Sequence, residues 1–183
     1  MIKLTTLVIV LLSISYSTRQ QQTEPSQETV KLEESEISER FTIKDKDYTL
    51  HFEIEKVKNQ QPVLVIAIEL QNGAHFISPN AKRDFTGKFY MDLGDYTNLD
   101  FEGDVVETPR SVEEFDAHPF MGGLVNWVRV NTTYRQHLEV KSQGDFEVFG
   151  RVRFTIEPRC TLEEIPFAIS YKDGIMKLID PKC

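Results

Sequence analysis

The sequence Asp145-Phe-Glu-Val-Phe-Gly-Arg-Val-Arg-Phe-Thr-Ile156 decides the fold, and Cys160 follows it closely. Its even-numbered positions are apolar apart from Gly150, and its odd-numbered positions are polar apart from Phe149. This alternation predicts a β-strand that has one face in a hydrophobic core and the other in water. Gly150 inside the pattern indicates either a bulge or a close approach of another backbone. We expect the strand to place Cys160 in a loop at one end of a sheet.

Further strands are predicted where short apolar or alternating stretches are bounded by turn residues. Tyr48–Ile54 alternates cleanly, whereas Val63–Leu70 is apolar at nearly every position, as is typical of a central strand covered on both faces. The other predicted strands are Ala74–Ile77, Gly87–Leu93, Asn98–Val106, Leu124–Val130, Thr133–Lys141, Phe167–Tyr171 and Ile175–Ile179. Val106–Gly123 is expected to be irregular, because prolines and glycines interrupt it.

Many short strands with polar turns, and no long helical period, predict an all-β fold. We expect an immunoglobulin-like antiparallel β-sandwich over residues 41–183, with an up-and-down barrel as the alternative. Trp127, Tyr134 and Phe154 are the predicted large members of its core.

Residues 1–17 are predicted to be a secretory signal peptide. Lys3 is their only charge, Leu4–Leu12 is apolar, and Ser15-Tyr-Ser17 provides small residues for cleavage. The apolar run is too short to span a bilayer, so no transmembrane segment is expected after signal cleavage. Residues 18–40 are polar and acidic, and we expect a disordered linker. The protein is therefore expected to be exported, either to the periplasm or outside the cell.

The net charge of −8 argues against nucleic-acid binding, which requires a basic face for the phosphates. The chain contains no Gly-x-Ser-x-Gly elbow, no glycine-rich phosphate loop and no His-Glu-x-x-His motif. The sequence therefore favours a non-enzymatic function without a cofactor. Two hypotheses follow: a binding or interaction domain, or a redox protein that uses its cysteines.

Cys160 and Cys183 are the only cysteines, and in an oxidising compartment they are the only possible intramolecular pair. A bridge between them would stabilise the fold by about 3 kcal/mol on the chain-entropy model. The alternatives are two free thiols, or a disulfide with a partner protein. Arg159 beside Cys160 favours a reactive thiolate, whereas Glu157, Glu163 and Glu164 disfavour it.

Three stretches resemble the amino-terminal, immunoglobulin-like domain of the bacterial thiol:disulfide interchange protein DsbD. They are Leu70–Ser78, Phe115–Phe120, and Phe146–Cys160 followed by Phe167–Tyr171. The resemblance implies a sandwich fold, periplasmic export and an exported or thioredoxin-like partner protein. The family keeps two cysteines in one loop, where Cys160 matches the second and Glu157 stands at the position of the first. The resemblance thus extends to the fold, while exchange activity would require Cys183 as the second thiol.

Ligand recognition is expected on two segments that combine aromatic and polar residues, because sandwiches often bind through loops. These segments are Asn80–Tyr90 and Phe115–Phe120. The alternative is that their phenylalanines only anchor loops to the core. The candidate ligand-loop residues in these two segments are Phe85, Phe115, His118 and Phe120. A further candidate, His75, lies in a separate predicted loop. His118 follows several carboxylates, but no paired-ligand spacing accompanies it, so no metal site is predicted.

Overall fold

A computed structural model describes residues 36–37, 40–56, 60–119, 121–179 and 181 of the chain. All of them belong to the compact unit Glu33–Cys183. The predicted signal peptide, nearly all of the predicted linker, Phe120 and Cys183 lie outside these ranges. The described residues form thirteen β-strands and no helix. No helix in the described part of the chain is therefore long and apolar enough to cross a membrane.

The first of the two large sheets has six strands, ordered β1-β3-β4-β10-β7, with β2 also paired to β3. All of its pairs are antiparallel. Its strands are β1 (Glu36–Ile37), β2 (Phe41–Lys44), β3 (Tyr48–Lys56), β4 (Val63–Leu70), β7 (Leu99–Thr108) and β10 (Thr132–Val140). The apolar strand β4 lies between β3 and β10, as its composition predicts.

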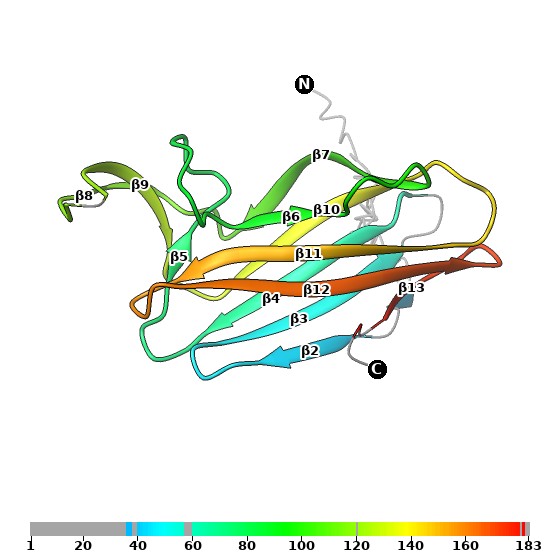
Figure 1. Cartoon of the computed structure of the whole chain (residues 1–183), viewed down its shortest axis with the longest axis horizontal. Helices are drawn as coiled ribbons and strands as arrows, with labels where there is room; N and C mark the ends of the chain where they lie inside the picture. Colours follow the sequence, from blue (N-terminus) through cyan, green and yellow to red (C-terminus); the bar gives the residue numbers. More distant parts are fainter. Residues whose placement is uncertain (1–35, 38–39, 57–59, 120, 180, 182–183) are drawn as a thin grey trace, which may run out of the picture. The chain divides into compact units, whose positions relative to one another are not determined.

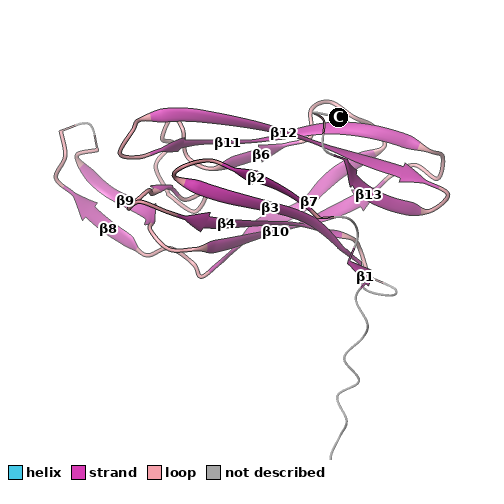
Figure 2. Cartoon of the chain, turned by 90° about the horizontal axis from the view of Figure 1, so that it is seen from below, coloured by secondary structure: helices cyan, strands magenta, loops and turns pink. Residues whose placement is uncertain are grey.

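The second large sheet is ordered β13-β12-β11-β6 and faces the first across the core (Figure 2). Its strands are β6 (Tyr90–Asp92), β11 (Phe146–Ile156), β12 (Thr161–Lys172) and β13 (Ile175–Ile179). The long hairpin of β11 and β12 runs in unbroken register from Phe146 opposite Tyr171 to Ile156 opposite Thr161. Gly150 therefore marks a close approach and not a bulge. A Cβ atom there would lie 2.3 Å from the ring of Phe167 and 2.8 Å from the backbone oxygen of Asp92.

A third, smaller sheet lies at one end of the sandwich, where β8 and β9 extend away from the two large sheets (Figure 1). Its order is β5-β9-β8, so β8 is an edge strand. Its strands are β5 (Phe76–Ile77), β8 (Glu113–Asp116) and β9 (Gly123–Val128).

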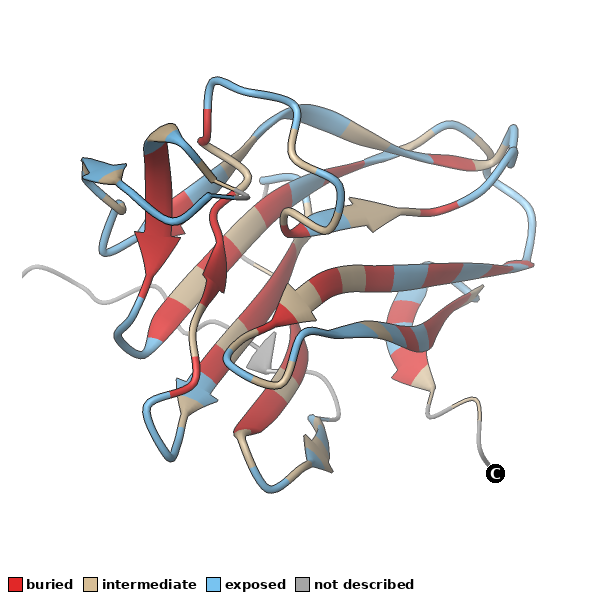
Figure 3. Cartoon of the chain, turned by 60° about the vertical axis from the view of Figure 1, so that its left-hand side comes forward, coloured by how far each residue is buried: buried red, intermediate tan, exposed pale blue. Residues whose placement is uncertain are grey.

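Alternating burial along the long strands places the main core between the two large sheets (Figure 3). Every even-numbered residue of β11 is buried, as its sequence pattern predicts. Tyr134 and Phe154 are fully buried in this core, whereas Trp127 is buried in a second, smaller cluster. The predicted all-β, immunoglobulin-like antiparallel sandwich is confirmed, and the barrel alternative is not.

Several strand bounds differ from the sequence prediction by a few residues, β2 was not predicted, and the largest differences are at β8 and β12. Strand β8 lies inside Val106–Gly123, which was expected to be irregular, and it is held by pairing with β9. Strand β12 begins at Thr161 and not at Phe167, because β11 pairs with its polar first half as well. In both cases the neighbouring strand provides the backbone hydrogen bonds that the side chains alone do not indicate.

Candidate functional site

The small sheet brings several candidate residues around one aromatic cluster. Trp127 of β9 forms this cluster with Ile77, Ala81 and Val125, and the partly buried Phe85 packs against it. The ring of His75 meets the Trp127 ring edge-on, with 4.9 Å between the ring centroids. His75 and Phe85 thus come together across Trp127, although neither was expected to share a site with it.

The turn after β8 is held by Asp116, the last residue of that strand. One carboxylate oxygen accepts a hydrogen bond from the backbone N–H of His118 at 2.7 Å. The other accepts one from the Trp127 indole N–H at 3.0 Å. These two hydrogen bonds, His118 first, lower the pKa of Asp116. His118 is exposed at this turn, and no group of three or more metal-ligating side chains occurs in the described ranges.

The outer strand of the same sheet presents large apolar side chains to solvent. Phe115 on β8 is 71% exposed, and Leu124 directly opposite it on β9 is 51% exposed. Val112, just before β8, is exposed as well. Phe115 was predicted to lie in a binding loop; it lies instead on an edge strand, where its pairing partner is also apolar. We call Phe115 and Leu124 the hairpin pair.

The segment Asn80–Tyr90 borders a hollow of about 240 Å³ on the outer face of the second large sheet. Phe85 contributes to its lining, and the Arg83 guanidinium lies 4.5 Å from the centre of the Phe85 ring. The opposite wall comes from Arg153 of β11 and Leu162 of β12. Strands distant in sequence therefore complete this candidate ligand segment.

Cys160 lies in the four-residue turn between β11 and β12, where it is exposed, has a backbone φ of 52° and has no disulfide partner among the described residues. The sequence correctly placed it in a turn at one end of a sheet. Cys183 lies outside the described residues, so the disulfide bridge with Cys160 stays a prediction. The same holds for the use of the two cysteines in redox exchange.

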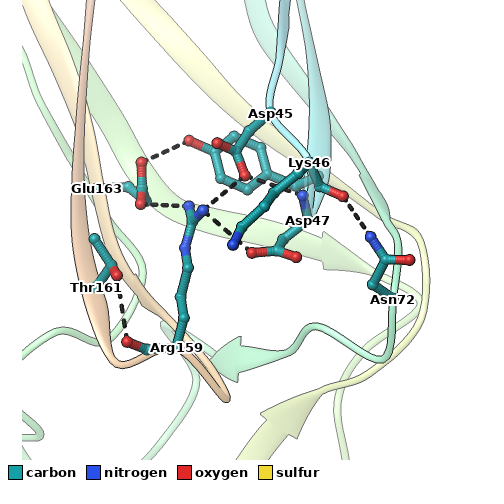
Figure 4. A network of polar contacts seen from close by, with 8 residues as sticks. Asp45, Lys46, Asp47, Asn72, Arg159, Thr161 and Glu163 are labelled. Carbon is teal, nitrogen blue, oxygen red and sulfur yellow. Dashed lines mark hydrogen bonds and ion pairs between the residues drawn. The ribbon is translucent and has the colours of Figure 1, made fainter.

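Arg159, next to Cys160, is bound to carboxylates on both large sheets (Figure 4). Its guanidinium lies 3.0 Å from Asp45 and 3.1 Å from Asp47, both in the β2–β3 turn, and 2.6 Å from Glu163. Glu163 also accepts the Tyr48 hydroxyl hydrogen at 2.8 Å. Three carboxylates surround the Arg159 guanidinium, so its charge is engaged by ion pairs. Arg159 thus connects the ends of the two large sheets, which is a structural role. The sequence had suggested that it favours a thiolate at Cys160.

Sequence reasoning missed three residues that the structure adds to these surfaces. Leu124 was predicted to be in a strand, but its exposure depends on the edge position of the hairpin. Arg153 lies on the polar face of the predicted strand Asp145–Ile156, and Leu162 lies in a stretch for which no strand was predicted. The polar parity of Arg153 in β11 was the only available signal, because it predicted an outward-facing side chain.

No family model, no curated protein and no solved structure matches the chain. The class of protein is therefore defined by the structure alone: an all-β, antiparallel sandwich with a small additional sheet at one end.

Proposed function

We propose that this chain is an exported, non-enzymatic immunoglobulin-like interaction domain that binds another exported protein through the hairpin pair. The observation that carries the proposal is the exposure of Phe115 and Leu124, directly opposite each other on an edge hairpin. Single exposed apolar residues are ordinary on protein surfaces, whereas adjacent ones indicate an interaction site.

The hairpin has the properties of a preorganised binding surface. Its far side is fixed by Val125 and Trp127 in the small cluster, and its end is fixed by the Asp116 hydrogen bonds. A rigid surface loses little conformational entropy when a partner binds. Because aromatic residues dominate the binding energy of protein interfaces, Phe115 is the expected centre of the contact.

The resemblance to the DsbD amino-terminal domain is part of the same proposal, since it supports export and a thioredoxin-like partner. The second candidate function is a periplasmic thiol–disulfide redox protein that uses Cys160 and Cys183. The exposure of Cys160 favours it. The Cys160→Ser variant separates the two candidates, because it abolishes thiol exchange but leaves binding at the hairpin pair unchanged.

The test uses a photo-crosslinking residue in place of Phe115 of the full chain. The control carries it at Ile175, which is 54% exposed on β13. We expect a specific adduct with an exported protein from position 115 only. With the purified partner, Phe115→Ser should weaken binding by about 2 kcal/mol, which corresponds to about thirtyfold. Equal effects of Phe115→Ser and Ile175→Ser would refute the proposal.

A further inference from the structure

The hollow beside Tyr90 combines an apolar wall with a guanidinium. Its apolar side chains are Phe85, Tyr90 and Leu162, of which Tyr90 is 49% and Leu162 is 56% exposed. Arg153 lies opposite Tyr90 in the pairing of β11 with β6, and its guanidinium carbon is 5.2 Å from the centre of the Tyr90 ring. A flat apolar surface thus lies next to the planar donor group of an arginine.

Arg153 is held loosely by its neighbours. Its two terminal nitrogens lie 3.9 Å from Asp92 and 3.9 Å from Glu164, which is beyond hydrogen-bond distance. Its Nε is buried and has no hydrogen-bond partner in the described part of the protein, so only the terminal nitrogens can reach a ligand. Asp92 instead accepts a 2.9 Å hydrogen bond from Nε of Arg151. Arg153 therefore keeps hydrogen-bonding capacity that its structural neighbours do not use.

The charges around the hollow favour an acidic ligand. Arg153 and Lys88 line it together with one carboxylate, Asp84, while Asp92 and Glu164 lie 3.9 Å from the Arg153 guanidinium and do not line the hollow. Arginine binds a planar carboxylate through two parallel hydrogen bonds, which are stronger than those between neutral groups. Two cations against one carboxylate in the lining favour an anion over a neutral ligand.

The wall of the hollow is fixed before any ligand binds. The backbone N–H of Thr155 donates a 2.7 Å hydrogen bond to the carbonyl oxygen of Gly87, which ties the Asn80–Tyr90 segment to β11. A Cβ atom at Gly87 would lie 2.0 Å from the Thr155 hydroxyl oxygen, so the Thr155 side chain packs closely against Gly87. The Lys88 N–H also donates to the Phe85 carbonyl oxygen at 3.2 Å. A preformed wall lowers the conformational cost of binding.

We propose that this hollow binds a carboxylate carried on a small ring. The carboxylate pairs with the terminal nitrogens of Arg153, and the ring lies against Tyr90 and Leu162. The ligand chemistry can come from a sugar acid of a glycan or from a free aromatic acid. The site is separate from the hairpin pair in its residues and in its ligand, so it stands or falls independently of the proposed protein partner.

The first experiment is an NMR titration of the isotope-labelled full chain with four probes: sodium galacturonate, sodium benzoate, galactose and benzyl alcohol. We expect one of the two acids to shift the amide signals of Gly87, Tyr90 and Arg153 in a saturable manner, while both neutral compounds shift them weakly. A response to galacturonate assigns the sugar-acid source, and a response to benzoate assigns the aromatic acid. If neither acid shifts these signals, or if a neutral compound binds as well as its acid, the proposal is wrong.

The second experiment compares Arg153→Gln with Arg151→Gln, which removes a charge from the same face of the same strand. Arg151 is bonded to Asp92 and does not line this hollow. Arg153→Gln should weaken binding of the responding acid about tenfold, because a charge-assisted hydrogen-bond pair is lost. Arg151→Gln should leave affinity within about twofold. Equal losses in the two variants, with both shown to be folded by their NMR spectra, would overturn the assignment to Arg153.

Discussion

Replacing Gly150 with alanine adds one methyl group to the most closely packed point of the β11–β12 hairpin. The new Cβ would lie 2.3 and 2.6 Å from two ring atoms of Phe167, and 2.8 Å from the backbone oxygen of Asp92. Carbon atoms pack best at about 3.5–4.0 Å, so each neighbour would have to move by about 1 Å. Phe167 is fully buried and contacts the Phe52 ring at a centroid distance of 5.8 Å, so its displacement would disturb the packing of the core.

The size of the effect follows from two opposing contributions. Overpacking of a dense core typically costs about 1–3 kcal/mol, and a second conflict with backbone places this site at the upper end. Alanine also restricts the unfolded chain and returns about 0.4–1 kcal/mol. We therefore expect Gly150→Ala to lower the free energy of unfolding by about 2 kcal/mol.

Urea denaturation followed by far-ultraviolet circular dichroism measures this loss. The matched control is Gly144→Ala, where the nearest atom to the added Cβ is the Ser142 hydroxyl oxygen at 3.9 Å. Its free energy of unfolding should change by less than about 0.5 kcal/mol. Adding Phe167→Leu to Gly150→Ala should give a loss smaller than the sum of the single losses, because one conflict is relieved. A loss below about 0.5 kcal/mol for Gly150→Ala would refute the close-packing argument.

Three further predictions concern charged and polar groups. Arg159→Met leaves three carboxylates together without their cation. Urea unfolding should show that the free energy of unfolding falls by about 1–3 kcal/mol and that added salt restores part of it. A loss that does not depend on salt would contradict this prediction. The pKa of Asp116 is lowered by the His118 backbone N–H and then the Trp127 indole, so its stabilisation is complete above about pH 4 and is lost as pH falls through the lowered pKa. The indole N–H signal in NMR should follow that titration, and an unchanged signal in Asp116→Asn at acid pH serves as the control. Burial, aided by the neighbouring Glu107 carboxylate, raises the pKa of Tyr134. The free energy of unfolding should therefore fall as pH rises above about 10, and it should fall less steeply in Tyr134→Phe. Equal slopes of stability against pH in the two proteins would contradict this prediction.

The core strands could be predicted from the sequence because burial repeats with the period of a strand. β11 alternates apolar and polar residues along its whole length, and its buried and outward faces follow that alternation. β8 lacks this signal, since Glu113–Asp116 contains one apolar residue and that residue faces solvent. Its strand conformation comes from pairing with β9, which is a tertiary contact. Trp127 was correctly predicted to be buried, but a period of two does not say which of two cores receives the side chain.

The candidate sites could be predicted only where one segment supplies the chemistry. Phe85 and Phe115 stood out because aromatic and polar residues alternate around them, and both lie on the surfaces described above. Arg153 lines the hollow beside Tyr90 only because β11 pairs with β6, a strand more than fifty residues earlier in the chain. The network of Arg159 depends in the same way on a turn between β2 and β3. Contacts of this kind depend on the order of the strands in the sheets, which the local pattern of apolar and polar residues does not predict.

The unbroken β11–β12 hairpin also bears on the order in which the protein folds. Its eleven residue pairs are joined by a turn of four residues, whereas β4 and β10 pair residues as far apart as Val63 and His137. Closing a short loop costs less chain entropy than closing a long one, so local pairings form earlier. We expect φ-values to be higher for Val148→Ala in β11 than for Ile66→Val in β4, both of which truncate fully buried side chains. The stretch from which the fold can be predicted would then also be the nucleus from which the sandwich assembles.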